Sequence, residues 1–382
     1  MTHSPGKPLL TANQVTFARL ALLPIGSWLL YQGVRGQWVA LVFMTIVGCT
    51  DFVDGWLARK YGPTVLGGLM DPIADKVFVA VTFLPMIDLG WLPGYIVGLL
   101  FVREFVVTAA RTAYERRKVS LKTSYLAKVK TWFQMCAGAL IFLYRTVQDP
   151  RAMDIVVIAI WALPVLGGVV QYAIKRRVWR GIVVWFFAWG ALAAATIAFG
   201  GVWASIGVGW AVLAITFASG GAYLVGMKDL PGTGRVDLHD VVRLFGSFTL
   251  PALVAALLVK HHALREAFLT GHASAPAWPA WPIITAISIE FAIGGLDNLL
   301  AHNKQLPGWP GWLARVGAQA VLLGAALAIA VRDPASPLVQ PLTMATLAIT
   351  LTSAAIVFYR NRAVYLGDLE KAPTRPAADS AR

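Results

Sequence analysis

The sequence predicts an all-α protein that crosses a membrane many times. Of its 382 residues, 58% are hydrophobic and only 14% are charged, which is more apolar surface than one water-soluble core can hide. Several apolar runs approach or exceed the ~18 residues that a spanning helix requires. The alternating pattern of a membrane β-barrel is absent from the sequence. The expected fold class is therefore a polytopic helical membrane protein.

Twelve helices are expected, because apolar runs alternate with short polar, basic or Gly- and Pro-rich segments. Basic or polar connections separate the earlier runs, and stretches such as "GHASAPAWPAWP", "NKQLPGWPGW" and "VRDPASP" separate the later ones. In chain order the expected helices are 15–33, 38–58, 69–87, 91–112, 124–146, 153–173, 181–199, 203–226, 242–260, 281–300, 312–331 and 340–359.

Clusters of basic residues predict the orientation in the membrane. Arg59 and Lys60, a second group at 116–122 and a third at 175–180 all follow even-numbered helices, so they lie on one side. The loops between them carry few basic residues, and the positive-inside rule makes the clustered side cytoplasmic. The net charge of +14 is therefore attributed to topology and to anionic membrane lipids, and no nucleic-acid partner is expected. The predicted location is the inner (cytoplasmic) membrane.

The expected organisation is two membrane domains and a tail. Residues 1–178 form a six-helix domain that ends at the basic break, and residues 179–360 form a further helical membrane domain with about six helices. Residues 361–382 are small, polar and Pro-containing, which predicts a flexible cytoplasmic tail. Cys49 and Cys136 lie in apolar segments without metal or disulfide spacing, so they are expected to be small core residues.

Four aspartates stand out in the stretch "DFVDGWLARKYGPTVLGGLMDPIADK". Asp51 and Asp54 share one face of a helix, and Asp71 and Asp75 share a face of the next helix. A short turn makes the two helices antiparallel neighbours, so the carboxylates can converge near the cytoplasmic boundary. A single charge at the centre of a membrane helix costs roughly 2.5 to 3.5 kcal/mol. Four that repel one another need protons or metal cations, and two Mg²⁺ or Mn²⁺ ions would leave positions for phosphate oxygens.

Small residues in the same stretch predict room for a nucleotide. Gly55 and Gly67 remove side chains where a ligand would approach the backbone, and Ala58 keeps the aspartate face open. For any single aspartate, an alternative stays open: Asp51 and Asp54 would pair with Arg59 and Lys60, and Asp71 would cap a helix at Pro72. Four aspartates at this spacing favour the metal site.

The stretch reads D-x2-D-G-x2-A-R-x7-G-x3-D-x3-D and resembles the signature of CDP-alcohol phosphatidyltransferases. The resemblance implies a six-helix membrane domain in which an alcohol displaces CMP from a CDP-linked lipid with the help of divalent metal. It implies that Asp75 is the catalytic base. The implied metal ligands are Asp51, Asp54, Asp71 and Asp75, and the implied nucleotide-binding residues are Asp51, Asp54, Gly55, Ala58, Arg59, Gly67 and Asp71.

Three further segments, "NQVTFAR", "REFVVTAART" and "YLAKVKTWFQM", resemble phosphatidylglycerophosphate synthases within that family. The implied substrates are CDP-diacylglycerol and sn-glycerol 3-phosphate. An anionic acceptor needs cations, and Arg103 and Arg111 lie about 80° apart around one helix. Lys128 and Lys130 lie about 200° apart, so only one of them is expected to reach the acceptor phosphate. The alternative for these residues is snorkelling to the interface.

Several points stay open at this stage. The acceptor could instead be serine, an inositol phosphate or phosphatidylglycerol, or the domain could be an inactive synthase-like part of a lipid transporter or scaffold. A homodimer is a further open point. In the second half, Glu290 and Asp297 are acidic residues in an apolar run, whereas His261, His262 and His272 are expected in a solvated loop.

Overall fold

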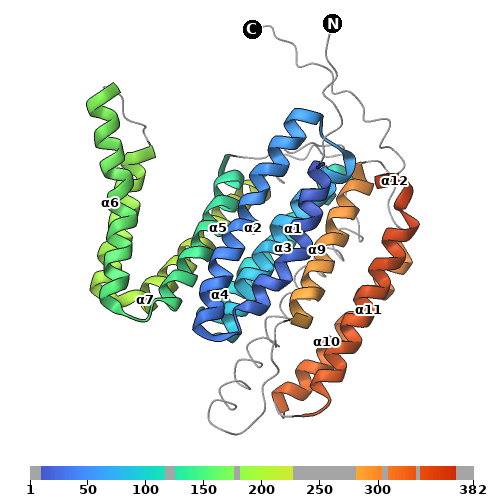
Figure 1. Ribbon diagram of the computed structural model, residues 1–382. Coiled ribbons are helices and arrows are strands. Elements are labelled where there is room, and N and C mark those ends of the chain that lie inside the picture. The colour runs from blue at the N-terminus through green and yellow to red at the C-terminus, as the bar shows by residue number, and fades with distance from the viewer. Residues whose placement is uncertain are drawn as a thin grey trace, which may run out of the picture.

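The computed structural model describes residues 10–116, 125–175, 181–226, 281–302, 309–332 and 336–366. This part of the chain consists of helices without strands, which confirms the predicted fold class (Figure 1). The helices are α1 (Ala12–Leu29), α2 (Gly33–Tyr61), α3 (Val65–Asp88), α4 (Gly94–Arg116), α5 (Tyr125–Thr146), α6 (Pro150–Lys175), α7 (Gly181–Gly226), α9 (Trp281–His302), α10 (Trp309–Arg332), α11 (Val339–Arg360) and α12 (Arg362–Leu366).

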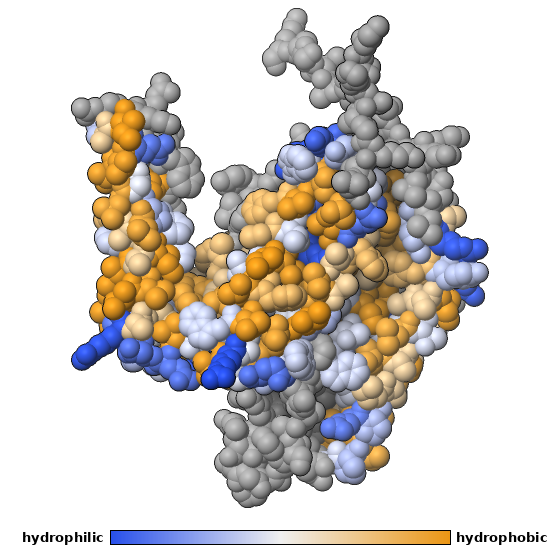
Figure 2. All heavy atoms as spheres, in the orientation of Figure 1, coloured by the Kyte–Doolittle hydropathy of each residue, from blue (hydrophilic) through white to orange (hydrophobic). Residues whose placement is uncertain are grey.

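The described helices include five that are long and apolar enough to cross a membrane. They are Gly33–Tyr61, Pro150–Ile174, Gly201–Gly221, Trp281–Ala301 and Val339–Arg360. The protein is therefore a multi-pass membrane protein, as the composition predicts. Figure 2 shows hydrophobic surface over α2 and α6, where Ile46 on α2 and Ile155 on α6 are each more than half exposed. Such side chains are suited to contact with lipid.

The helix bounds agree with the expected ones to within a few residues. The element labelled α7 consists of two helices that meet at a kink, where Gly200 has φ 82° and ψ 159°, so the two helices expected at 181–199 and 203–226 are confirmed. Only glycine adopts this conformation without strain. The short helix α12 occupies the start of the predicted tail. The helix expected at 242–260 and the three histidines lie outside the described residues.

Helix α3 forms the centre of the bundle. Every residue from Val77 to Asp88 is buried, because α1, α4, α5 and α9 pack around this helix. α2 packs along α1 and against α5. The two helices that carry the aspartate motif are therefore held in place by α1 on one side and by α4, α5 and α9 on the others (Figure 1).

Helix α7, which begins after the predicted domain boundary, packs against helices of the first predicted domain. It packs against both α4 and α5, whereas α6 packs mainly against α7 and stands apart from the bundle (Figure 1). A Cβ atom on Gly209 would lie 2.8 Å from Leu92 Cδ2, so this glycine allows α7 to approach the start of α4 closely. The predicted domain boundary near residue 178 thus precedes a helix that joins the first bundle.

Candidate active site

Helix α1 supplies the side chains that join the four aspartates. Its start is fixed by a capping box, in which the Thr11 hydroxyl accepts a hydrogen bond from the Gln14 backbone N–H and the Gln14 side chain accepts one from the Thr11 N–H. With the helix beginning at Ala12, Thr16 and Arg19 follow one turn apart and face α2 and α3.

Arg19 lies between the carboxylates of α2 and α3. Its Nη1 is 2.6 Å from Asp51 Oδ1 and 3.9 Å from Asp75 Oδ1, and its Nη2 is 3.2 Å from Asp54 Oδ2. The Arg19 side chain is only 1% exposed. A buried guanidinium requires anionic partners, and the aspartates supply them. Arg19, and not Arg59 or Lys60, is therefore the basic partner of Asp51 and Asp54.

Thr16 connects the two helices of the motif a second time. Its Oγ1 lies 3.0 Å from Asp54 Oδ2 and 3.2 Å from Asp71 Oδ1. One hydroxyl has one proton, so it donates to one of these carboxylates at a time. Asp71 lies inside α3, whose N-cap is Thr64, so Asp71 does not cap this helix. Through Thr16 and Arg19, all four aspartates share partners on α1.

The turn between α2 and α3 brings the start of α3 against α1. Gly62 has φ 99°, which favours glycine, and the Thr64 hydroxyl donates to Asn13 Oδ1 at 2.8 Å and accepts from the Gly67 N–H. A Cβ atom on Gly67 would lie 2.9 Å from Asn13 Oδ1, so this glycine is needed for helix packing. A Cβ on Gly55 would meet only the Arg59 guanidinium, with Nη1 at 3.5 Å and Nη2 at 4.0 Å.

The cationic residues from α4 and α5 form a connected group. Arg103 Nη1 donates to Glu104 Oε1 at 3.2 Å, and Lys130 Nζ donates to the same oxygen at 2.5 Å. Arg103 Nη2 also donates to Ser219 Oγ of α7 at 2.7 Å. Because Glu104 is 5% exposed and has two basic partners, the group remains cationic overall.

Of the other residues expected to bind the acceptor phosphate, the structure describes the side chain of Arg111 and not that of Lys128. Arg111 is half-buried on α4, one further cation on this side of the bundle. The Lys128 side chain lies outside the described residues. Lys76, which directly follows Asp75, was not among the expected site residues, yet its ammonium interacts electrostatically with Asp75, Glu104, Lys130 and Arg111. The sequence feature that could have identified Lys76 is its position directly after Asp75, in the stretch "DPIADK".

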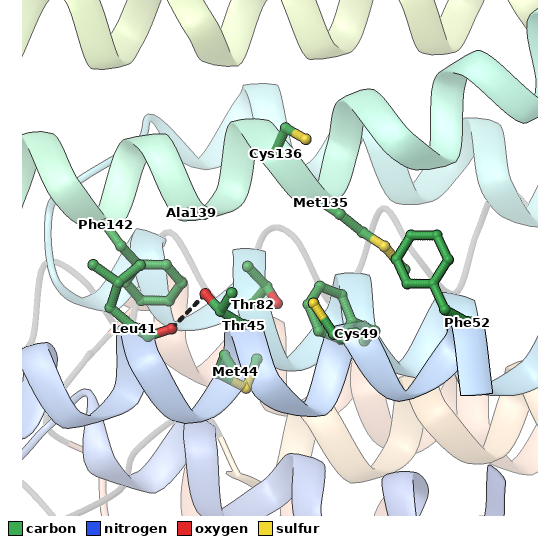
Figure 3. Close-up of a pocket in the computed structure, with 12 residues that line it drawn as sticks. Leu41, Met44, Thr45, Cys49, Phe52, Thr82, Met135, Cys136, Ala139 and Phe142 are labelled. Carbon is green, nitrogen blue, oxygen red and sulfur yellow. Dashed lines mark hydrogen bonds between the residues drawn. The ribbon is translucent and has the colours of Figure 1, made fainter. Parts of the chain in front are cut away.

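An apolar groove of about 170 Å³ opens between α2, α3 and α5 (Figure 3). It begins near Phe52, next to Asp51, and continues along α2 to Leu41. Cys49 and Cys136 line it and are exposed, so the prediction that they are core residues is wrong. The groove lining is Leu41, Met44, Thr45, Gly48, Cys49, Phe52, Phe78, Thr82, Met135, Cys136, Ala139 and Phe142. A hydrocarbon chain matches this lining.

The aspartates provide the donor atoms that a divalent metal prefers. Carboxylate oxygens are hard ligands suited to Mg²⁺ or Mn²⁺. Asp75 Oδ1 is buried, and among the described residues it has no hydrogen-bond partner, as a metal ligand or a base would require. Within the described ranges, no three acidic, His or Cys side chains already lie close enough together to hold an ion. The donor chemistry fits, although Arg19 now lies between the carboxylates.

Glu290, one of the two acidic residues expected in an apolar run of the second half, has partners on α10. Glu290 of α9 accepts two hydrogen bonds from Arg315, each at 3.3 Å, and one from Gln319 at 3.0 Å, both on α10. Gln319 also donates to Thr350 Oγ1 of α11 at 2.6 Å. Asp297 is 5% exposed. These contacts identify Glu290 as part of a buried polar network that joins α9, α10 and α11.

Comparison with known proteins gives one family. The sequence profile of CDP-alcohol phosphatidyltransferase matches residues 9–218. A CDP-diacylglycerol--glycerol-3-phosphate 3-phosphatidyltransferase of Rickettsia bellii is 32% identical over 146 residues, which is 38% of this chain and 81% of that protein. A probable phosphatidylglycerophosphate synthase of Mycobacterium tuberculosis is 34% identical over 176 residues, 45% of this chain and 84% of that protein. No solved structure matches significantly.

Proposed function

The chain belongs to the CDP-alcohol phosphatidyltransferase family, and on that premise we propose that it transfers the phosphatidyl group of CDP-diacylglycerol to sn-glycerol 3-phosphate. The products are phosphatidylglycerophosphate and CMP. The names of these two relatives support this reaction, and the similarity extends over more than four fifths of the length of each relative. The proposal concerns somewhat more than the first half of the chain, because the family profile ends at residue 218.

The observation that carries the proposal is the gathering of four motif aspartates around Arg19 and Thr16. Asp51, Asp54, Asp71 and Asp75 come from two helices, and partners on α1 hold them at one place. Helix-end charges would instead be solvated separately. Four neighbouring acids in a membrane protein, of which Asp54 is buried and the other three are partly exposed, are expensive to hold together, so they indicate a functional site.

In the proposed reaction the four aspartates hold divalent metal, Mg²⁺ or Mn²⁺, with two ions as the expected number. When bound, the metal neutralises the pyrophosphate and stabilises the departing CMP. Asp75 takes the proton of the acceptor hydroxyl, whose oxygen forms a bond to the phosphatidyl phosphorus as the bond to CMP breaks. Asp75 Oδ1 supports this assignment, because it has no hydrogen-bond partner among the described residues and its ion-pair contact with Arg19 is long, at 3.9 Å. Gly55, Ala58, Arg59 and Gly67 shape the nucleotide site.

The acceptor phosphate binds on the cationic side of the site. Lys130, Arg111 and Arg103 are the proposed ligands, with Lys128 as the alternative to Lys130. Glu104 holds Lys130 and Arg103 in position through two hydrogen bonds. Acceptors without a phosphate, such as serine, would leave these cations without an anion.

The diacylglycerol chains of the donor extend into the membrane along α2 and α5. The apolar groove beside Phe52 supports this placement, because it begins next to Asp51. The basic clusters of the sequence support an inner-membrane location, with the site facing the cytoplasm. Membrane lipids are the surrounding partners.

Acceptors offered one at a time to the purified protein test the reaction. With CDP-diacylglycerol and Mg²⁺ present, we expect CMP release to be fastest with glycerol 3-phosphate among glycerol 3-phosphate, serine, inositol phosphate and phosphatidylglycerol. Faster release with another acceptor would replace the proposed substrate. No release with any of them would favour the inactive-scaffold alternative.

Asp75→Asn tests the proposed base. General-base catalysis contributes about 10²- to 10⁴-fold, so CMP release should fall by at least about 100-fold. Asp149→Asn is the matched control, because Asp149 is exposed at the start of α6 and should leave the rate unchanged. Retained activity in Asp75→Asn would remove this residue from the mechanism.

A further inference from the structure

Helix α9 lies outside the residues that match the family, yet it packs against α3 and α4 (Figure 1). Two adjacent glycines allow the close approach. A Cβ atom on Gly295 would lie 2.9 Å from Ile73 Cγ1, and a Cβ on Gly294 would lie 3.2 Å from Thr108 Cγ2. The helix therefore contacts both the helix that carries Asp75 and the helix that carries the proposed acceptor arginines.

Phe291 of α9 contacts side chains of both α4 and α3. Its ring is 1% exposed and stacks on Phe105 of α4, with ring centroids 4.3 Å apart and an interplanar angle of 11°. On the α3 side, Lys76 Nζ lies over the Phe291 ring at 5.3 Å from its centroid. This distance is within the range of a cation–π interaction.

Lys76 is held from two directions. Its ammonium lies over the Phe291 ring and donates to Thr108 Oγ1 at 2.7 Å, and Thr108 in turn donates to the Glu104 carbonyl oxygen at 2.7 Å. The neighbouring charges are Asp75, Glu104, Lys130 and Arg111, so Lys76 belongs to the cationic group already described. A ring from the second half of the chain thus contacts a cation next to the proposed base.

We propose that α9 is a part of the acceptor site, in which Phe291 is a positioning residue that holds Lys76 where its ammonium helps to bind the acceptor phosphate. This inference rests on the proposed function. It assigns the second half of the chain a role in the reaction, and it adds Lys76 to the residues that select a phosphate-bearing acceptor. Without the ring, the long lysine side chain can adopt other rotamers and its charge leaves the group.

Phe291→Leu, Lys76→Met and the double variant form the test. CMP release is measured against glycerol 3-phosphate concentration at saturating CDP-diacylglycerol. Each single variant should raise the KM for glycerol 3-phosphate by about 5-fold, the size expected for loss of one partly buried cation–π contact, with kcat within about two-fold. The double variant should be no worse than Lys76→Met, because Phe291 acts through Lys76.

Phe358→Leu is the matched control. Phe358 lies on α11 of the same half, with its ring 6.0 Å from Tyr365, and the substitution should leave the KM unchanged. Equal kinetics of Phe291→Leu and the wild-type protein would overturn the proposal. So would additive effects in the double variant, or a fall in kcat with KM unchanged.

A crosslink tests the position of α9 without relying on activity. In the variant with both Ile73→Cys and Gly295→Cys, mild oxidation should join the two cysteines, which mass spectrometry of the linked peptides detects. Ile73→Cys with Val321→Cys, an exposed residue of α10, is the negative control. Absence of the 73–295 crosslink would overturn the inference. A wild-type protein that is inactive with glycerol 3-phosphate would instead refute the proposed function.

Discussion

Arg19 offers the sharpest test of how the aspartate site is held together, and Arg19→Met removes its charge while keeping a long apolar stem. The side chain is 1% exposed and contacts Asp54, which is itself 5% exposed, at 3.2 Å. Removal of one partner of a buried ion pair costs about 3 to 5 kcal/mol, because the other charge remains buried without compensation. Loss of the Arg19–Asp51 contact adds little to this free-energy cost, since the Asp51 side chain is 41% exposed and its charge is solvated.

The lower end of that range is expected for Arg19→Met, since Thr16 still donates to Asp54 or Asp71 in the variant. A loss of about 3 kcal/mol should lower the thermal unfolding midpoint of the detergent-solubilised protein by several degrees. Scanning fluorimetry measures this midpoint, and the 15 tryptophans give a strong signal. Activity is not needed for the measurement.

Two further variants separate charge from packing. Arg35→Met carries the same substitution at an exposed position of α2 and should leave the midpoint unchanged. Asp54→Asn in the Arg19→Met background removes the uncompensated charge and should recover much of the lost stability. If Arg19→Met unfolds at the same temperature as Arg35→Met, Arg19 does not balance the buried carboxylates and the reasoning fails.

Three other substitutions test the contacts around the site. Gly220→Ala places a Cβ atom 2.8 Å from Arg103 Nε, so it should displace this arginine and weaken acceptor binding, which appears as a raised KM for glycerol 3-phosphate; an unchanged KM would separate Arg103 from the acceptor. Ala139→Trp fills the groove and should raise the KM for long-chain more than for short-chain CDP-diacylglycerol, whereas an equal effect on both would contradict the chain placement. Gln319→Leu removes donors to Glu290 and Thr350 and should destabilise the protein by about 1 to 3 kcal/mol in thermal unfolding, with Gln171→Leu at an exposed site of α6 as the control.

The sequence by itself determined the helices and the spacing within the motif. Long apolar runs are local signals, and the membrane requires that backbone groups pair within each helix, so the spans could be placed to within a few residues. The i, i+3 and i, i+4 spacing of the aspartates put each pair on one face for the same local reason. Even the break between 199 and 203 was visible, because Gly200 and Gly201 interrupt an apolar run.

The facing of each helix could not be predicted in the same way. In a membrane, both the core side and the lipid side of a helix are apolar, so hydrophobicity does not distinguish them. Cys49 and Cys136 were therefore assigned to the core, although both are exposed beside the groove. For the same reason, the sequence did not show which side of α2 is buried. Met44 is buried in the structure, whereas Ile46 is 63% exposed.

Only the tertiary structure decided the partners of the charged residues. Arg19 meets Asp51 from 32 positions away, and Arg103 meets Ser219 from 116 positions away. Lys76 lies over a ring of α9, beyond the residues in which the family was recognised. A buried charge pairs with an opposite charge or polar group that the packing of distant helices brings close to it. The partner therefore depends on distance in three dimensions, which spacing along the chain does not encode.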